Sequence, residues 1–235
     1  TEIYTLSLHD ALPISGEAPR KEELKKAAIA MGEMAKMENV EIRFSTAVTP
    51  ELIKEINPDE VVIAIGAEPI KPNIPGGDSS HVTNSHDVLA GNVAVDGNVV
   101  VIGGGLVGLE VAEYLSEKAD SITVVEMLDQ VAKDLGQLRK ICVMESMYEH
   151  RIKAITSAKC VEIKTDAVIV EQNGGLQEIP CDYVVIAIGA RSRASNDIAA
   201  YCDENKVPYH TIGDALRARR ALNATAEAGE LARRI

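Results

Sequence analysis

The stretch NVVVIGGGLVGLEVAEYLSEKADSITVVE, from Asn98 to Glu126, decides the fold of this chain. It begins with an apolar, β-branched run at 98–102, a composition typical of a strand that is buried on both faces of a parallel sheet. Gly103, Gly105 and Gly108 follow with the spacing G-x-G-x-x-G, and an apolar helical pattern continues beyond them. The stretch therefore predicts a strand, a tight glycine turn and a helix in immediate succession.

The three glycines have separate roles in a dinucleotide site. Gly103 permits the tight turn, Gly105 lets the backbone approach a pyrophosphate that a Cβ would block, and Gly108 lets the helix pack closely on the strand. The start of the helix then faces the phosphates, and its free N–H groups favour an anion without any basic side chain. The alternative interpretation of the same spacing is a glycine-rich turn in an ordinary α/β protein.

A second predicted strand, Ser121 to Val125, ends at an acidic residue, Glu126. A carboxylate at this position accepts hydrogen bonds from the adenosine ribose hydroxyls of a bound dinucleotide. The same carboxylate repels a 2′-phosphate, and the segment 127–130 contains no arginine that could bind one. These residues predict NADH rather than NADPH as the nicotinamide cofactor.

The bulk properties describe a globular chain without a nucleic-acid surface. Its 235 residues allow one large domain or two small ones, and 46% of them are apolar. The formal net charge of −12 argues against binding to nucleic acid or to an anionic membrane. No apolar run reaches the roughly 18 to 20 residues of a spanning helix, and no signal-peptide pattern is visible, so we expect a cytoplasmic protein.

The cysteines and histidines do not form a recognisable site in the sequence. Cys142, Cys160, Cys181 and Cys202 lie far apart, without a Cys-x-x-Cys pair or a zinc-type spacing. We therefore expect no metal site and no dithiol redox centre. The five histidines are also scattered, and no residue is assigned a catalytic role.

The first residues, TEIYTLSLHDALPI at 1–14, do not begin with methionine and resemble the conceptual translation of a sequencing adapter. We expect this segment to be an artefact at the start of a truncated reading frame. The alternative is a genuine partial strand and loop.

The remaining sequence predicts two β/α units joined through a segment rich in proline and glycine, EPIKPNIPGGDSS at 68–80. Before this segment we expect an amphipathic helix at 20–37, with Leu24, Ala27, Ala28, Met31 and Met34 on its apolar face. After the glycine turn, a β-meander at 160–180 is predicted around Asn173-Gly174-Gly175. The other predicted elements are strands at 40–44, 60–65, 151–157, 183–188 and 208–212, and helices at 49–56, at 135–149 and from about 215 to 235.

Two strand ends repeat each other, VVIAIGAEP at 61–69 and YVVIAIGARSR at 183–193. Together with the glycine spacing, Glu126 and the terminal motif at 211–214, they resemble the flavoproteins that have two dinucleotide-binding domains. More narrowly, the sequence from Glu17 onward is similar to the C-terminal portion of the NADH:flavin oxidoreductases related to 2,4-dienoyl-CoA reductase and enoate reductase. This resemblance is carried by residues 48–76, 98–115 and 124–136.

The resemblance implies an α/β fold of two Rossmann-like, three-layer domains with a β-meander. It implies an NAD(P)H-binding domain at 67–189, inserted into a partial FAD-binding domain formed by 15–66 and 190–235. The family passes a hydride from NAD(P)H to FAD, and electrons then travel through a 4Fe-4S cluster to FMN, which reduces an activated C=C bond. FMN, the cluster, the barrel domain that holds them and the first glycine fingerprint would all lie before Gly16.

The resemblance also assigns roles to single residues. Asp214, after Gly213, matches the aspartate that binds the FAD ribitol, and Glu110 matches a glutamate near the nicotinamide ribose. The implied cofactor-binding residues are Gly103, Gly104, Gly105, Leu106, Val107, Gly108, Glu110, Glu126, Gly66, Ile188, Gly189, Gly213 and Asp214. The expected partners are nicotinamide and flavin dinucleotides and the barrel domain of the same protein. Alternatives are a reductase of the ferredoxin or rubredoxin type, and an inactive NAD-binding module.

Overall fold

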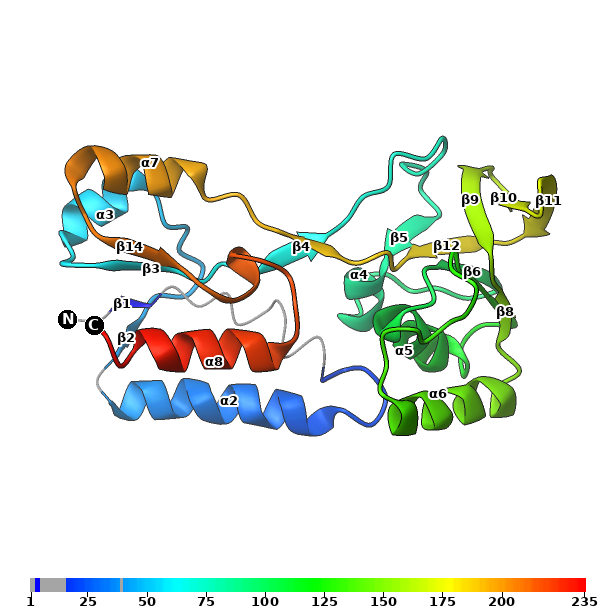
Figure 1. Cartoon of the computed structure of the whole chain (residues 1–235), viewed down its shortest axis with the longest axis horizontal. Helices are drawn as coiled ribbons and strands as arrows, with labels where there is room; N and C mark the ends of the chain where they lie inside the picture. The colour runs from blue at the N-terminus through cyan, green and yellow to red at the C-terminus, as the bar shows by residue number, and fades with distance from the viewer. Residues whose placement is uncertain (1–2, 5–15, 39) are drawn as a thin grey trace. The chain divides into compact units, whose positions relative to one another are not determined.

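The computed structural model describes residues 3–4, 16–38 and 40–235 of the chain. The described residues divide into two compact units, the first made of 3–4, 26–38, 40–68 and 190–235 and the second of 16–25 and 69–189 (Figure 1). Within the segment expected to be an artefact, Ile3–Tyr4 form a short strand, β1, which pairs in parallel with β2 (Glu41–Ile42). The rest of that segment lies outside the described residues.

The second unit is built on a five-stranded sheet with the order β5-β12-β6-β7-β8. All four neighbouring pairs are parallel, as expected for strands connected by crossover helices. The glycine turn follows β6 directly, so it lies at the carboxyl edge of the sheet. The bounds are β5 Val82–Asn84, β6 Asn98–Ile102, β7 Ser121–Val125, β8 Lys153–Ile155 and β12 Tyr183–Ile186.

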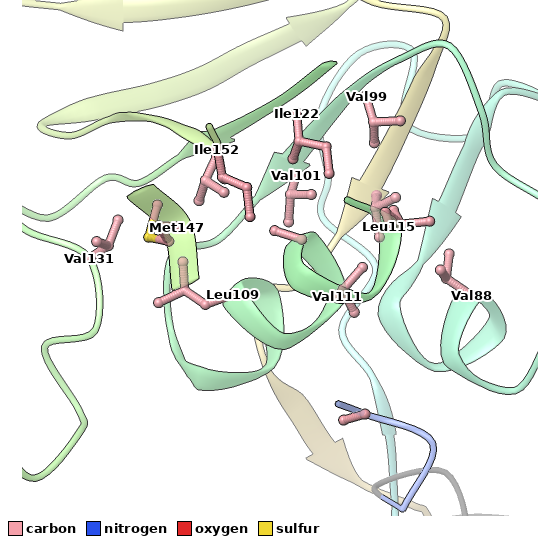
Figure 2. Packing of buried hydrophobic residues seen from close by; sticks show 14 of the residues in the cluster. Val88, Val99, Val101, Leu109, Val111, Leu115, Ile122, Val131, Met147 and Ile152 are labelled. Carbon is pink, nitrogen blue, oxygen red and sulfur yellow. The ribbon is translucent and has the colours of Figure 1, made fainter. Parts of the chain in front are cut away.

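Strand β6 is buried on both faces, because its alternating side chains belong to two different cores. Val99 and Val101 pack with helix α5 (Leu106–Leu115), whereas Val100 and Ile102 pack on the opposite face. Figure 2 shows Leu109 and Leu115 of α5 in the first of these cores, close to the side chains of the sheet. Helices α4 (Ser85–Leu89) and α6 (Gln137–Glu149) contribute Val88, Leu89, Val143 and Met147 to the same core.

The opposite face of the sheet is covered by the predicted meander. Its antiparallel strands are β9 (Ala158–Ile163), β10 (Ala167–Gln172) and β11 (Gly175–Pro180), in the order β11-β10-β9. Val168 and Val170 of β10 are fully buried between the two layers. The second unit therefore has three layers of helices, parallel sheet and meander, which confirms the predicted Rossmann-like α/β fold.

The first unit has a smaller parallel sheet, formed by β3 (Val61–Ile63) and β14 (Tyr209–Thr211). Helices α3 (Pro50–Ile56) and α7 (Asn196–Asn205) supply most of its core, in which Ile53, Ile63 and Cys202 are buried. The predicted start of α3 is confirmed, because the Thr49 hydroxyl accepts a hydrogen bond from the Leu52 N–H at 3.3 Å. The remaining elements are α2 (Glu22–Met37), β4 (Ala67–Pro69), β13 (Ala190–Ser192), the short 3₁₀ helix η1 (Gly213–Ala215) and α8 (Ala221–Leu231).

The predicted burial of α2 is only partly correct. Ala28 is buried as expected, but Ala27, Met31 and Met34 are exposed. Periodicity identifies the apolar face of a helix but does not show that the described residues cover it. The strand predicted at 40–44 contains only two paired residues, and α8 ends at Leu231 rather than near the C-terminus.

Residues 16–25 group with the second unit and contact helix α5. Ala18 is 1% exposed and belongs to the core that α5 forms with the sheet. Two ion pairs accompany this contact, from Arg20 to Glu113 at 3.0 Å and from Lys21 to Glu110 at 2.5 Å. None of the described helices is long and apolar enough to cross a membrane.

Candidate dinucleotide-binding site

The turn between β6 and α5 has the close packing that its glycines predict. Gly103 has φ +111°, and a Cβ on it would lie 2.3 Å from the carbonyl oxygen of Ala187. A Cβ on Gly108 would lie 1.9 Å from the carbonyl oxygen of Gly103. Both positions therefore require glycine, and together they bring the start of α5 against the end of β6.

Gly105 is the N-cap of α5 and has an extended backbone, with φ −77° and ψ −176°. No side chain caps this helix start, and Leu106 and Val107 form its first turn, with Val107 41% exposed. In the direction of the missing Cβ, the nearest atoms belong to the carboxyl group of Asp134, at 3.7 to 3.9 Å. Nothing touches Gly105 closely on this side, so the helix start remains accessible to an anion.

The carboxylate of Glu126 joins the end of β7 to the glycine turn. Its Oε2 accepts a hydrogen bond from the Gly104 N–H at 2.6 Å, and its Oε1 accepts one from the Leu128 N–H at 2.7 Å. The backbone is fixed as well, because Glu126 N–H donates to the carbonyl of Ile155 at 2.9 Å. The acid predicted from the sequence thus lies directly beside the predicted turn.

The loop after Glu126, residues 127–136, folds onto the same turn. The Ala132 N–H donates to the carbonyl of Gly104 at 2.8 Å, and both Val131 and Ala132 are buried. A Cβ on Gly104 would meet the Val131 side chain at 2.7 Å, so the loop covers this glycine tightly. This contact was not predicted from the sequence. The signal that could have indicated it is the apolar pair at 131–132 in an otherwise polar loop.

Glu110 lies on α5 with its side chain 5% exposed. Its Oε1 is 2.5 Å from the Lys21 Nζ and 3.4 Å from a guanidinium nitrogen of Arg139 on α6. Two cations of the same unit thus contact the carboxylate that the resemblance places near a nicotinamide ribose. Neither cation was predicted, because both are far from Glu110 in the sequence.

The terminal motif of the first unit forms a second cluster of polar contacts. Gly213 N–H donates to Oε2 of Glu227 at 2.8 Å, and Arg219 pairs with the other carboxylate oxygen. Oδ1 of Asp214 accepts a hydrogen bond from the Arg219 N–H at 3.0 Å. The Arg219 guanidinium and the Gly213 N–H lower the pKa of Glu227, since both stabilise its charged form.

The two repeated strand ends share a left-handed glycine. Gly66 has φ +74° and Gly189 has φ +107°. The carbonyl of Gly66 accepts from the Arg193 N–H at 3.1 Å, and that of Gly189 accepts from the Ile70 N–H at 3.0 Å. Beside Gly189, the side chain of Ile188 is 39% exposed.

The described part of the chain contains no group of three His, Cys, Asp or Glu side chains that could hold a metal ion. All four cysteines are free thiols. Cys160, Cys181 and Cys202 are buried, while Cys142 is exposed on α6. Cys142 is therefore the exposed thiol of the described residues, and the glycine turn offers an uncapped helix start beside a carboxylate.

A comparison with protein-family models matches residues 31–208 to the family described as pyridine nucleotide-disulphide oxidoreductase. This chain belongs to that family. Members of the pyridine nucleotide-disulphide oxidoreductase family are FAD- and NAD-dependent oxidoreductases, so the chain is a flavin-dependent pyridine-nucleotide oxidoreductase module.

Curated relatives within this oxidoreductase group are several reductases and an oxidase. A bilirubin reductase of Mediterraneibacter gnavus is 34% identical over 226 residues, which cover 96% of this chain and 35% of the relative. An NADH oxidase of Thermoanaerobacter brockii is 33% identical, covering 94% of this chain and 35% of the relative. A cinnamate reductase of Clostridium sporogenes is 31% identical, covering 83% and 29%. The chain thus spans about a third of the length of these relatives.

A solved structure with the same fold is a 2-naphthoyl-CoA reductase in complex with 2-naphthoyl-CoA. It has a TM-score of 0.88 and 26% identity, and the match covers 95% of this chain and 34% of the other. A histamine dehydrogenase from Rhizobium has a TM-score of 0.82 at 18% identity, covering 95% and 38%, and it supports the fold alone. The fold of these two solved structures therefore extends over nearly the whole chain.

Proposed function

We propose that residues 67–189 bind NADH and that the chain is the electron-entry part of a flavin-dependent oxidoreductase, in which a hydride passes from NADH to FAD. The observation that carries this proposal is the junction of β6, α5 and β7. There, an accessible helix start at Gly105 and the carboxylate of Glu126 lie on either side of Gly104. No basic side chain is required, because the helix dipole and its free N–H groups favour the pyrophosphate.

The residues at this junction fit the parts of a dinucleotide. The N–H groups at Leu106 and Val107 would hold the pyrophosphate, with Gly105 leaving room for its approach. Glu126 would accept hydrogen bonds from the adenosine ribose hydroxyls, after exchanging a backbone N–H for a ribose donor. When bound, NADH and FAD supply the redox chemistry, and the protein supplies their binding and orientation.

NADH is proposed over NADPH because of the charges around Glu126. A 2′-phosphate near this carboxylate would meet like-charge repulsion. Two lysines of this region already have partners in the loop: Lys133 of the loop contacts Asp129 at 3.1 Å, and Lys140 of α6 contacts Gln130 at 2.7 Å.

The flavin part of the proposal concerns the first unit. We assign 15–66 and 190–235 to a partial FAD-binding domain and 67–189 to the NAD(P)H-binding domain. Residues 16–25 of the first of these segments pack with the second unit, on helix α5. Gly213 and Asp214 would approach the ribitol of FAD, and Gly66, Ile188 and Gly189 would lie where the backbone passes bound dinucleotides. Supporting this assignment, Gly213 adopts φ +61° at the end of β14, so its backbone bends away from the strand at this point.

For the whole protein, the proposed activity is the reduction of an activated C=C bond, with FMN and a 4Fe-4S cluster held by a part of the protein outside this chain. The names of two relatives, cinnamate reductase and 2-naphthoyl-CoA reductase, support this class of substrate. Both named compounds contain an unsaturated carbon framework conjugated to a carbonyl group.

The decisive experiment compares two valine substitutions at helix N-caps. Gly105→Val places a branched side chain where the pyrophosphate would lie, whereas Gly136→Val makes the same change at the N-cap of α6, where nothing lies within 4 Å. Both glycines have negative φ, so both variants should fold. We expect calorimetric titration to show NADH binding by the wild-type and Gly136→Val chains, and at least about a hundredfold weaker binding by Gly105→Val.

Unchanged NADH binding in Gly105→Val would overturn the assignment of the site. Adding FAD to the wild-type chain then tests the electron-entry role, with oxidation of NADH followed at 340 nm. NADH binding without flavin-dependent oxidation would identify a nucleotide-binding module rather than an active part of an enzyme.

A further inference from the structure

Helix α6 carries apolar side chains on two opposite faces. One face packs in the core of the second unit through Val143 and Met147. A surface helix normally has polar residues on the face opposite its core. On α6 that face instead carries four exposed large side chains, of which the most exposed is 87% accessible: Leu138, Ile141, Met144 and Tyr148. The described residues leave this face open to solvent, as is typical of a surface that associates with another protein.

Three of these side chains have the spacing of a coiled-coil seam. Ile141, Met144 and Tyr148 are separated by three and then four residues, which are the steps between the a and d positions of a heptad. These three residues form the α6 seam. They line one surface groove along the helix, together with polar neighbours that include Lys140 and Glu145. In the same heptad Lys140 holds the g position and Glu145 the e position, so opposite charges flank the two sides of the seam.

The charges beside the seam favour a particular partner and a particular direction. In a parallel pair of identical helices, each g residue faces the e residue five positions later on the other helix. A second copy of α6 would therefore place Lys140 of each chain beside Glu145 of the other. In an antiparallel pair g faces g and e faces e, so like charges would meet. The Lys140 ammonium donates to the neutral amide of Gln130 at 2.7 Å, and its three N–H donors allow a carboxylate as a further partner.

We propose that the α6 seam binds the α6 seam of a second copy of this chain, in a parallel pair flanked by two contacts between Lys140 and Glu145. Both chains use the same surface, so the contact closes as a symmetric dimer. Helix α6 has 13 residues and is about 20 Å long, so the contact buries less than the roughly 800 Å² per partner of a standard interface. The dimer is therefore weak, with a Kd on the order of 100 µM.

Sedimentation equilibrium of the full chain at low salt, from about 10 µM to about 1 mM, measures this association. Lys140→Glu and Glu145→Lys each replace an attraction between the two chains by a repulsion. Each variant alone should therefore have a Kd for self-association that is raised at least about tenfold. An equimolar mixture of the two variants should associate about as tightly as the wild-type chain, because each glutamate then meets a lysine. This recovery also shows that both variants are folded.

Two further variants test the direction of the pair and the effect of net charge. Lys140→Gln weakens a parallel pair, in which the lysine is attracted, and strengthens an antiparallel pair, in which it is repelled. Lys159→Gln makes the same change in net charge on an exposed position of β9, in the layer that covers the other face of the sheet, and should leave the Kd unchanged.

A wild-type chain that remains monomeric at about 1 mM would overturn the inference, since the α6 seam would then have another occupant. A dimer that persists unchanged in Lys140→Glu and in Glu145→Lys would also overturn it. Tighter association of Lys140→Gln would overturn the parallel arrangement.

Discussion

The thiols of Cys160 and Cys181 lie in the core between the parallel sheet and the meander. Burial raises the pKa of each to about 11, because a thiolate loses hydration in apolar surroundings. The Cys202 thiol in the first unit is shifted in the same direction by its burial. Burial protects these three side chains in two ways. It keeps reagents away from the sulfur atoms, and it disfavours the thiolate, which is the reactive form.

We expect iodoacetamide at pH 8 to modify the exposed Cys142 first in the folded chain. Cys160 and Cys181 should react at least about a hundredfold more slowly than Cys142, because only a small fraction of each buried thiol is ionised at that pH. Peptide mass spectrometry at timed intervals measures each site separately. In 6 M urea, all four cysteines should react at similar rates, and rapid modification of Cys160 without urea would contradict the burial described here.

The second prediction at this scale concerns the acid sensitivity of Glu227. Its pKa is lowered in the folded chain by Arg219 and by the Gly213 N–H, so the unfolded chain binds more protons as the pH falls. The stabilisation is therefore complete above the pKa of an unfolded glutamate, about 4.3, and is lost as the pH falls through the folded-state value.

Urea unfolding followed by circular dichroism should find Glu227→Gln less stable than the wild-type chain at pH 7, and the two should converge below about pH 4. Glu230→Gln is the control, because Glu230 lies on the same helix and pairs with Arg234, whose side chain is exposed. Its unfolding free energy should follow the wild-type value at each pH. A constant difference between Glu227→Gln and the wild type across this range would show that the charge is not the cause.

At the scale of elements, helix α5 carries two acids whose partners differ. Glu110 is 5% exposed and contacts both Lys21 and Arg139, while Glu113 is 13% exposed and pairs with Arg20, whose side chain is 59% exposed. Loss of a buried partner leaves cations without compensation, whereas an exposed pair contributes little.

We therefore expect Glu110→Gln to lower the unfolding free energy by about 1 to 3 kcal/mol. Glu113→Gln should lower it by less than about 1 kcal/mol. Urea unfolding at pH 7 measures both. Equal effects of the two substitutions would show that the contacts of Glu110 do not stabilise the packing of residues 16–25 and of α6 on α5.

The elements also show what a sequence can and cannot predict. Strands β6 and β7 have the predicted bounds, because β-branched runs flanked by a glycine turn and an acid leave few alternatives. Helices α4 and α7 and strand β5 were not predicted. Strand β5 and α4 are only three and five residues long and lack a clear apolar period, so local pattern gives little signal for them.

At the scale of the whole chain, one stretch of about thirty residues predicted a strand, a glycine turn, a helix, a second strand and an acid, and the family resemblance implied the Rossmann-like α/β fold around them. The glycine turn and Glu126 of the candidate site were also found in this way, because they are close in sequence. The contacts of Lys21, Arg139 and Ala132 were not, since they depend on how distant segments and an irregular loop pack on α5 and on the glycine turn.

The docking of residues 16–25 on α5 has a consequence for the evolution of this fold. Because Ala18 and Lys21 belong to the second unit while the next stretch, 26–68, belongs to the first, the gene encodes the second unit in two separate pieces. A recombination event that transferred only residues 69–189 to another protein would leave Ala18 and Lys21 behind. The core beside α5 would then contain a cavity, and Glu110 would lack its lysine partner. Transfer of the longer stretch 16–189 would keep Ala18 and Lys21 together with the helix that they contact.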